Sequence, residues 1–267
     1  MEASPPIWAR PYHEPQDRLA NVTLFAFADE LLDLSSTISR SRYGVPAGFD
    51  LGTLDVRQHQ RKEVPEWFGG FFTPEMLSVS KLDPGGLDGE YEDLAVAYSV
   101  QLEIPEPPNL AYLQGCWGFM MWLCEIGAKV ILDEHAIRWH AGEQIIQLDP
   151  LREFDIKNEI SVVFETEDTP GFGHVMHTRG LVKFGRPDLV LKGVEPADAE
   201  AGGVLLNGLA SRAAKGAALR ENQTVGPNGL AARHLSRYEP GVTHPEVNLN
   251  NDGLVLDIAG WGLRERR

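Results

Sequence analysis

Apolar and polar residues alternate along several short stretches of the chain, and this spacing predicts half-buried β-strands. The clearest alternation lies between residues 94 and 104, where every second position is apolar: Val96, Tyr98, Val100, Leu102 and Ile104. The strand is expected to end at Pro105, the first of three closely spaced prolines (Pro105, Pro107 and Pro108). Shorter apolar stretches predict strands at residues 21–27, 128–132, 137–139, 160–164, 174–176, 188–191 and 254–258, and a strand or hairpin within 49–62.

Apolar residues at three- and four-residue steps predict a helix over residues 110–126. Asn109 is the expected N-cap and Gly127 the residue just past the C-terminus. Gly115 and Gly118 lower helix propensity, so we expect the helix to lie close against a sheet at these two points. An Ala- and Leu-rich segment predicts a second long helix over residues 199–219. We also expect a short helix within 29–42 and a packed aromatic loop at 66–72.

The order of these elements predicts an α+β fold, with mainly antiparallel sheets and helices on one face. Residues 1–17 contain four prolines and predict an irregular N-terminal arm. The rest is predicted to form two similar α+β halves, 18–145 and 146–267, although the boundary is weakly marked and a single domain is the alternative.

The composition is that of a globular protein, with 43% hydrophobic and 24% charged residues. The N-terminus has neither the basic start nor the apolar core of a signal peptide, so we expect a cytoplasmic protein. The most apolar stretch, residues 110–123, is too short to span a bilayer, which predicts no membrane insertion. Cys116 and Cys124 lie about 12 Å apart along one predicted helix, so we expect two buried thiols.

Negative charge is unevenly distributed along the sequence. The formal net charge is −15, and there is no basic residue between Lys81 and Lys129, although eight carboxylates lie there. Such a surface repels phosphate backbones, so nucleic acid is not an expected partner. The acidic charge serves either solubility or the steering of a basic partner. For the second interpretation the candidate binding residues are those of one predicted exposed turn: Asp83, Asp88, Glu90, Tyr91, Glu92 and Asp93.

The least generic segment is His177-Thr-Arg-Gly-Leu-Val-Lys-Phe-Gly-Arg-Pro-Asp-Leu. We predict a structural corner between two strands, in which Gly180 or Gly185 adopts a positive φ and Pro187 stiffens the approach to the next strand. Phe184 is expected to anchor the corner to a core, and Arg179 to pair with Asp188 or Glu165. His174, His177 and Arg179 together offer the alternative of a phosphate or carboxylate site.

This segment resembles an uncharacterised bacterial domain-of-unknown-function family with a Thr-x-Gly-Leu-x-x-Phe-Gly-x-Pro-Asp/Glu-Leu motif, here Thr178 to Leu189. The resemblance extends over about residues 100–260: the run 113–133 matches an apolar helix and short strand upstream, and 205–218 matches an Ala/Leu-rich helix downstream. It implies a shared fold without an assigned activity. Members of such families often occur in bacterial toxin–immunity systems, which is an association rather than a mechanism.

No nucleophile elbow, phosphate loop or dinucleotide-binding sequence is present, and no cofactor is expected. A metal site would draw on His135, His140 and the nearby carboxylates of Asp133, Glu134 and Glu143. The two histidines are five positions apart and would project from opposite faces of a strand, so we expect no metal. Cys116 and Cys124 have no basic neighbour that would favour a thiolate.

These observations favour a non-enzymatic, protein-binding protein, for which an immunity protein that neutralises a basic toxin is the specific hypothesis. The first alternative is a hydrolase or metal-dependent enzyme that uses a His/carboxylate site. The second alternative is a scaffold without a dedicated ligand. The sequence leaves the oligomeric state and the identity of the partner open.

Overall fold

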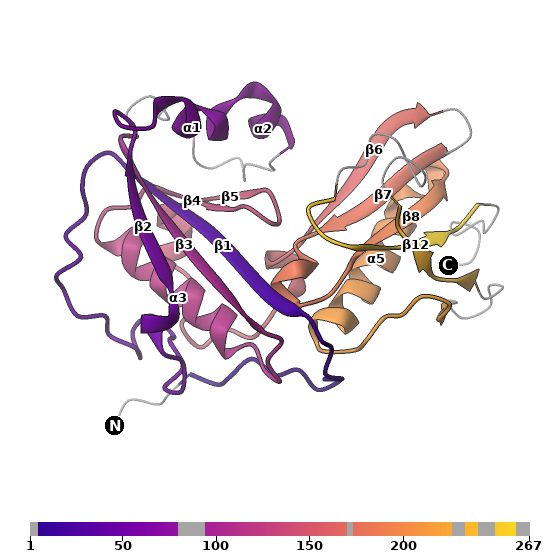
Figure 1. The fold of residues 1–267 in the computed structure, drawn as a ribbon, viewed down its shortest axis with the longest axis horizontal. Coiled ribbons are helices and arrows are strands. Elements are labelled where there is room, and N and C mark those ends of the chain that lie inside the picture. The colour runs from indigo at the N-terminus through magenta and orange to yellow at the C-terminus, as the bar shows by residue number, and fades with distance from the viewer. Residues whose placement is uncertain (1–4, 80–93, 170–172, 226–232, 240–248, 260–267) are drawn as a thin grey trace. The chain divides into compact units, whose positions relative to one another are not determined.

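The computed structural model describes residues 5–79, 94–169, 173–225, 233–239 and 249–259. The chain forms two compact units (Figure 1). The first comprises Met1–Ala9 and Asn21–Phe154, and the second comprises Arg10–Ala20 and Asp155–Arg267. The predicted N-terminal arm is therefore divided, with residues 1–9 in the first unit and residues 10–17 in the second. The fold is α+β with mostly antiparallel sheets, which confirms the predicted class.

The first unit is built on a five-stranded sheet with the strand order β2-β3-β1-β4-β5. Its strands are β1 (Leu19–Ala28), β2 (Asp55–Gln60), β3 (Val96–Pro105), β4 (Val130–Asp133) and β5 (Arg138–Ala141). The predicted hairpin is confirmed, because β4 and β5 pair antiparallel with Leu132 opposite Trp139. The predicted strand over 94–104 is also confirmed as β3, which lies inside the sheet and is buried on both faces over its first five residues.

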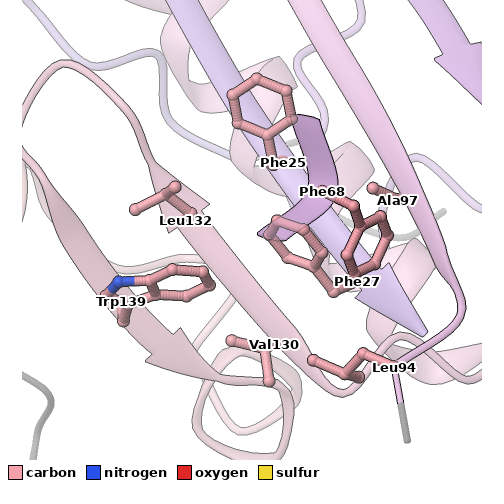
Figure 2. Close-up of a cluster of buried hydrophobic side chains, with 8 residues drawn as sticks. All are labelled: Phe25, Phe27, Phe68, Leu94, Ala97, Val130, Leu132 and Trp139. Atoms are coloured by element: carbon pink, nitrogen blue, oxygen red, sulfur yellow. The ribbon is translucent and has the colours of Figure 1, made fainter. Parts of the chain in front are cut away.

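One face of this sheet carries an aromatic cluster. Phe25 and Phe27 alternate with smaller residues along β1, so both rings project to the same side as Trp139 of β5 (Figure 2). Short helices cover them: α1 (Pro65–Gly69), η2 (Gly70–Phe72) and α2 (Pro74–Val79). Phe68 of α1 meets Phe27 edge to face at a centroid distance of 5.6 Å. The expected aromatic loop at 66–72 is therefore wrong, since these residues form short helical turns above the sheet.

Helix α3 (Ala111–Glu125) packs on the opposite face of the same sheet. Its Trp117 contacts His140, which alternates with Trp139 on β5 and so projects away from the aromatic cluster. Helices thus cover both faces of this sheet, and the expectation of helices on one face is wrong for the first unit. The expectation that Asn109 is the N-cap is wrong by one position, because the N-cap is Leu110; Oδ1 of Asn109 still accepts from the amide of Ala111, the first helical residue, at 3.0 Å.

The two helical glycines mark close approaches, but against a loop rather than a sheet. A Cβ on Gly115 would lie 2.1 Å from the ring of Phe49, and one on Gly118 would lie 2.6 Å from the carbonyl oxygen of Tyr43. Both neighbours belong to the irregular segment 43–49. The expected helix within 29–42 is also wrong, since this stretch forms turns and bends.

The second unit contains another five-stranded sheet, of order β11-β12-β8-β7-β6, in which only β12 and β8 among the described pairs run parallel. Its strands are β6 (Ser161–Thr169), β7 (Gly173–Arg179), β8 (Asp188–Val194), β11 (Ser236–Arg237) and β12 (Gly253–Asp257). Helix α5 (Ala199–Ala214) packs on one face, where Gly202 lies against Met176 and Leu191. The other face carries a small cluster around Val175, Val190 and Val255 that Tyr238 covers.

The remaining elements are short. They are η1 (Leu51–Thr53), α4 (Gly142–Ile146), η4 (Ile156–Asn158), η5 (Leu181–Phe184), η6 (Pro196–Asp198) and the paired strands β9 (Thr224–Val225) and β10 (Arg233–His234). Among the described residues, no helix combines the length and the apolar character needed to cross a membrane.

Candidate functional site

The acidic residues proposed as a binding surface, Asp83, Asp88, Glu90, Tyr91, Glu92 and Asp93, lie outside the described residues. The second sequence candidate, the corner from His177 to Leu189, is fully described and connects β7 to β8 through η5. The predicted backbone is confirmed at both glycines, since φ is 106° at Gly180 and 63° at Gly185. A side chain is strained in this region, which explains why glycine brackets the short helix.

A hydrogen bond between Thr178, near the end of β7, and Asp188, at the start of β8, links the two strands at the corner. The hydroxyl of Thr178 donates to Oδ1 of Asp188 at 2.8 Å and accepts from the amide of Leu189 at 2.9 Å. Asn251 donates to Oδ2 of the same carboxylate at 3.1 Å. Asp188 is fully buried, and this burial raises its pKa to about 6 although the hydrogen bonds from Asn251, Thr178 and Leu181 act in the opposite direction.

The polar side chains that precede the corner are also engaged. His177 is buried, and its Nε2 lies 2.8 Å from Oε1 of Glu165 on the neighbouring strand β6. Burial lowers the pKa of Arg179, while the carboxylates of Asp188 and Glu165 favour its charged form. His174 is half-buried and stacks on Phe164 at 5.5 Å. This arrangement holds a corner together through interlocking polar contacts.

Two buried arginines, which the sequence interpretation did not single out for this role, bind the end of α5. Nε of Arg10 donates to the carbonyl of Ala214 at 3.0 Å, and Nη2 of Arg186 donates to that of Gly216 at 2.7 Å. Carbonyl groups at a helix C-terminus lack intrahelical donors and carry partial negative charge, so buried guanidinium groups stabilise them. Arg186 also donates to the carbonyl of Ala217 and thereby ties the corner to the segment after the helix.

A cavity of about 400 Å³ lies beside this corner. All of its walls belong to the second unit. They are formed by residues near the N-terminus, residues of the corner, residues after α5 and residues near the C-terminus: Gln16, Arg18, Arg186, Pro187, Ala218, Leu219, Glu221, Arg237, Tyr238, Asn251, Asp252, Gly253 and Leu254. These segments are far apart in the sequence, which is why no motif indicated the cavity. Its lining is mixed, with three arginines and two carboxylates.

The other chemical candidates do not assemble into a site. His135 contacts Oδ1 of Asn21 at 3.1 Å, whereas His140 packs against Trp117. In the described part of the chain, no group of three or more His, Cys, Asp or Glu side chains is placed to hold a metal ion. Cys116 and Cys124 are buried, and burial raises the pKa of the Cys124 thiol to about 12, which opposes thiolate chemistry.

The first unit exposes an unexpected apolar surface on the segment predicted to be helical. We name residues 29–36 the acidic leucine loop. Leu31 is 55% exposed and Leu34 is 43% exposed, and the exposed carboxylates Asp29, Glu30 and Asp33 flank them. The sequence predicts only a short helix within 29–42 and gives no sign that Leu31 and Leu34 are exposed.

Contacts with the body of the first unit hold this loop in place. The amide of Leu32 donates to the hydroxyl of Tyr98 at 2.8 Å, and the indole of Trp122 donates to the hydroxyl of Ser36 at 3.3 Å. Asp33 accepts from the amide of Ser35 at 2.9 Å, and its hydrogen bonds to Ser35 lower its pKa. This local turn competes with a helix, which explains why none forms.

Comparison with known proteins places the chain in no family: no family model, curated protein or solved structure matches it.

Proposed function

We propose that the chain is a non-enzymatic, protein-binding protein whose first unit docks a basic protein partner. Neutralisation of a basic toxin, as an immunity protein, is the specific form of this proposal. The acidic leucine loop is the observation that carries it, because two exposed leucines three positions apart are framed by three exposed carboxylates. An apolar centre inside a charged rim is a common anatomy of protein interfaces.

The distribution of charge between the two units supports a basic partner. The first unit contains 22 acidic and nine basic residues, a balance of −13, whereas the second contains 17 and 15, a balance of −2. A negative electrostatic potential concentrated on one unit accelerates association with a positively charged protein and orients that protein toward the unit. General solubility would not require the excess to be confined to one part of the chain.

The anchoring of the loop supports binding rather than passive exposure. Leu32 and Ser36 are fixed by Tyr98 and Trp122, so Leu31 and Leu34 are presented from a backbone that is already ordered. A preformed surface loses less conformational entropy on association than a loop that must fold onto its partner. The leucines would then supply most of the affinity, and the carboxylates would act mainly on the association rate.

The proposal is tested by capturing partners from the native host and measuring their binding to three variants. The double variant Leu31→Ser/Leu34→Ser should weaken affinity for a genuine partner by about tenfold or more, mostly through faster dissociation. The triple variant Asp29→Asn/Glu30→Gln/Asp33→Asn should slow association and reduce its dependence on salt. Leu151→Ser is the matched control, because Leu151 is 50% exposed on the same unit but lies outside the loop.

Equal losses in the loop variant and in Leu151→Ser would contradict the assignment of the interface. Recovery of no protein partner would count against a protein-binding role and favour the enzymatic alternative. For the specific immunity form, a toxin gene beside this gene and inhibition of that toxin by the wild-type chain are the expected outcomes. A captured partner that is acidic would exclude charge complementarity as the basis of recognition.

A further inference from the structure

The cavity beside the corner in the second unit has the composition of a small-ligand site. We propose that it binds a small molecule or chain end with a single oxyanion group, either a carboxylate or a phosphate monoester. Its volume of about 400 Å³ falls within the range of ligand pockets in proteins. This inference concerns a different unit from the proposed protein interface, so either one can fail without the other.

Basic residues are concentrated in the lining of the cavity, although the chain as a whole is strongly acidic. Arg18, Arg186 and Arg237 all line it, from three segments that are separate in the sequence. Arg237 is exposed, and within the described part of the chain its guanidinium has no hydrogen-bond or ion-pair partner. A guanidinium presents paired donors that match the two oxygens of a carboxylate or phosphate, so Arg237 is the expected primary contact.

The other two arginines differ from Arg237 in what they can contribute. Arg186 is 1% exposed and donates to the carbonyls of Gly185, Gly216 and Ala217, so it supplies fixed positive charge rather than donors for a ligand. Arg18 is one-third exposed and is held by Asp252 at 3.1 Å, which keeps its side chain at the wall of the cavity. Together they create a positive potential that is present before any ligand arrives.

The two acidic residues of the lining limit the charge of the ligand. Glu221 and Asp252 oppose three arginines, which leaves a formal balance of +1. A polyanion such as a nucleic acid backbone would meet both carboxylates and be repelled. A ligand with one oxyanion and an aromatic body fits better, because Tyr238 contributes an aromatic side chain to the lining. The amide of Asn251 is not available to a ligand, since it already donates to the carbonyl of Arg186 and to Asp188.

The test uses the full chain and three probes in NMR titrations that follow backbone amides. Hippurate represents a peptide-like carboxylate, phenyl phosphate represents a phosphate monoester, and hippuramide is the neutral counterpart of hippurate. At least one anionic probe should bind and shift amides of residues 237–238 and 251–254, whereas hippuramide should not. Whether hippurate or phenyl phosphate binds more tightly distinguishes the two sources of the oxyanion.

Two arginine variants provide the matched comparison. Arg237→Ala should weaken binding of the anionic probe by about tenfold or more, since a charge-assisted hydrogen bond is lost. Arg212→Ala removes the same charge from an exposed position on α5 outside the cavity and should leave binding unchanged. The proposal is overturned if neither anion binds, if hippuramide binds as well as hippurate, or if the two variants weaken binding equally.

Discussion

Lys183 and Glu159 form an ion pair that is almost completely removed from solvent, with Nζ and Oε2 2.9 Å apart and side-chain exposures of 0% and 4%. Lys183 lies in η5 of the corner, and Glu159 follows η4 just before β6. Because each charge would be buried without its counter-ion, Lys183→Met or Glu159→Gln alone should lower the free energy of unfolding by about 3–5 kcal/mol. Urea unfolding of the single and double variants measures this.

The double variant Lys183→Met/Glu159→Gln should be less destabilised than the sum of the two single changes, because it leaves neither buried charge uncompensated. Simple additivity of the two losses would show that the ion pair contributes little to holding the corner.

Asp188 should make the stability of the protein depend on pH. Its pKa in the folded state is raised to about 6 by burial, so the folded protein binds this proton more tightly than the unfolded chain. The corresponding stability is present at low pH and is lost as pH rises from about 4 through about 6. Asp188→Asn does not titrate, so the wild type should lose stability relative to this variant across that interval. A difference between them that is constant from pH 4 to 7 would contradict the interpretation.

Much of the fold was predictable because local patterns specify it. The alternation in β3 and the three- and four-residue spacing in α3 identified the type and position of both elements from the sequence. Their burial goes further than the periodicity predicts, because β3 is buried on both faces over its first five residues and α3 is buried on all sides from Tyr112 to Cys124. The acidic leucine loop was not predictable, since it depends on contacts with Tyr98 and Trp122, which lie more than 60 positions away. These tertiary hydrogen bonds fix the loop, and the local turn between Asp33 and Ser35 opposes a helix there.

The candidate sites were predictable only in part. The glycines of the corner were identified because a positive φ has a residue-specific signature in sequence. The cavity has no such signature, since Arg18 meets Asp252 across a separation of 234 residues. Buried arginines that bind carbonyls, such as Arg186, are equally invisible, because a sequence does not reveal which surface charges are taken inside.

Gly185 should tolerate no β-branched side chain. Gly185→Val places such a residue at φ 63°, which should cost about 1–3 kcal/mol in thermal or chemical unfolding. Gly208→Ala is the opposite case, because Gly208 is exposed within α5 and a Cβ there would meet no heavy atom within 4 Å. It should stabilise the protein by about 0.5–1 kcal/mol. If Gly185→Val folds normally and loses a partner, the corner is a binding element rather than a structural one.

Trp117 should be among the most costly residues to truncate in the first unit. It is 3% exposed in α3, so Trp117→Ala should destabilise the protein by about 3–5 kcal/mol and lower the melting temperature. Trp67 is the matched comparison, because it is 39% exposed at the edge of the aromatic cluster. Trp67→Ala should cost less, about 1–2 kcal/mol. Equal losses at the two positions would argue that α3 is not central to the core.

The acidic segment between Asp83 and Glu106 is predicted to contribute to the partner interface. Between Asp83 and Asp93 its sequence concentrates carboxylates around Tyr91, and the segment belongs to the unit that carries nearly all of the excess negative charge. Because charges at the rim of an interface act mainly on encounter, neutralising Asp88, Glu90, Glu92 and Asp93 together should slow association and flatten its salt dependence.

The matched control changes the net charge by the same amount elsewhere on the first unit, through Gln at the exposed positions Glu63, Glu66, Glu143 and Glu153. Stopped-flow association with the captured partner, measured over a range of salt concentrations, compares the two quadruple variants with the wild type. If the segment forms part of the interface, its variant slows association more than the control, because charges close to the partner are screened less by salt than distant ones. Equal slowing would mean that the partner responds to the overall field of the first unit. Unchanged association in both would remove electrostatic steering from the mechanism.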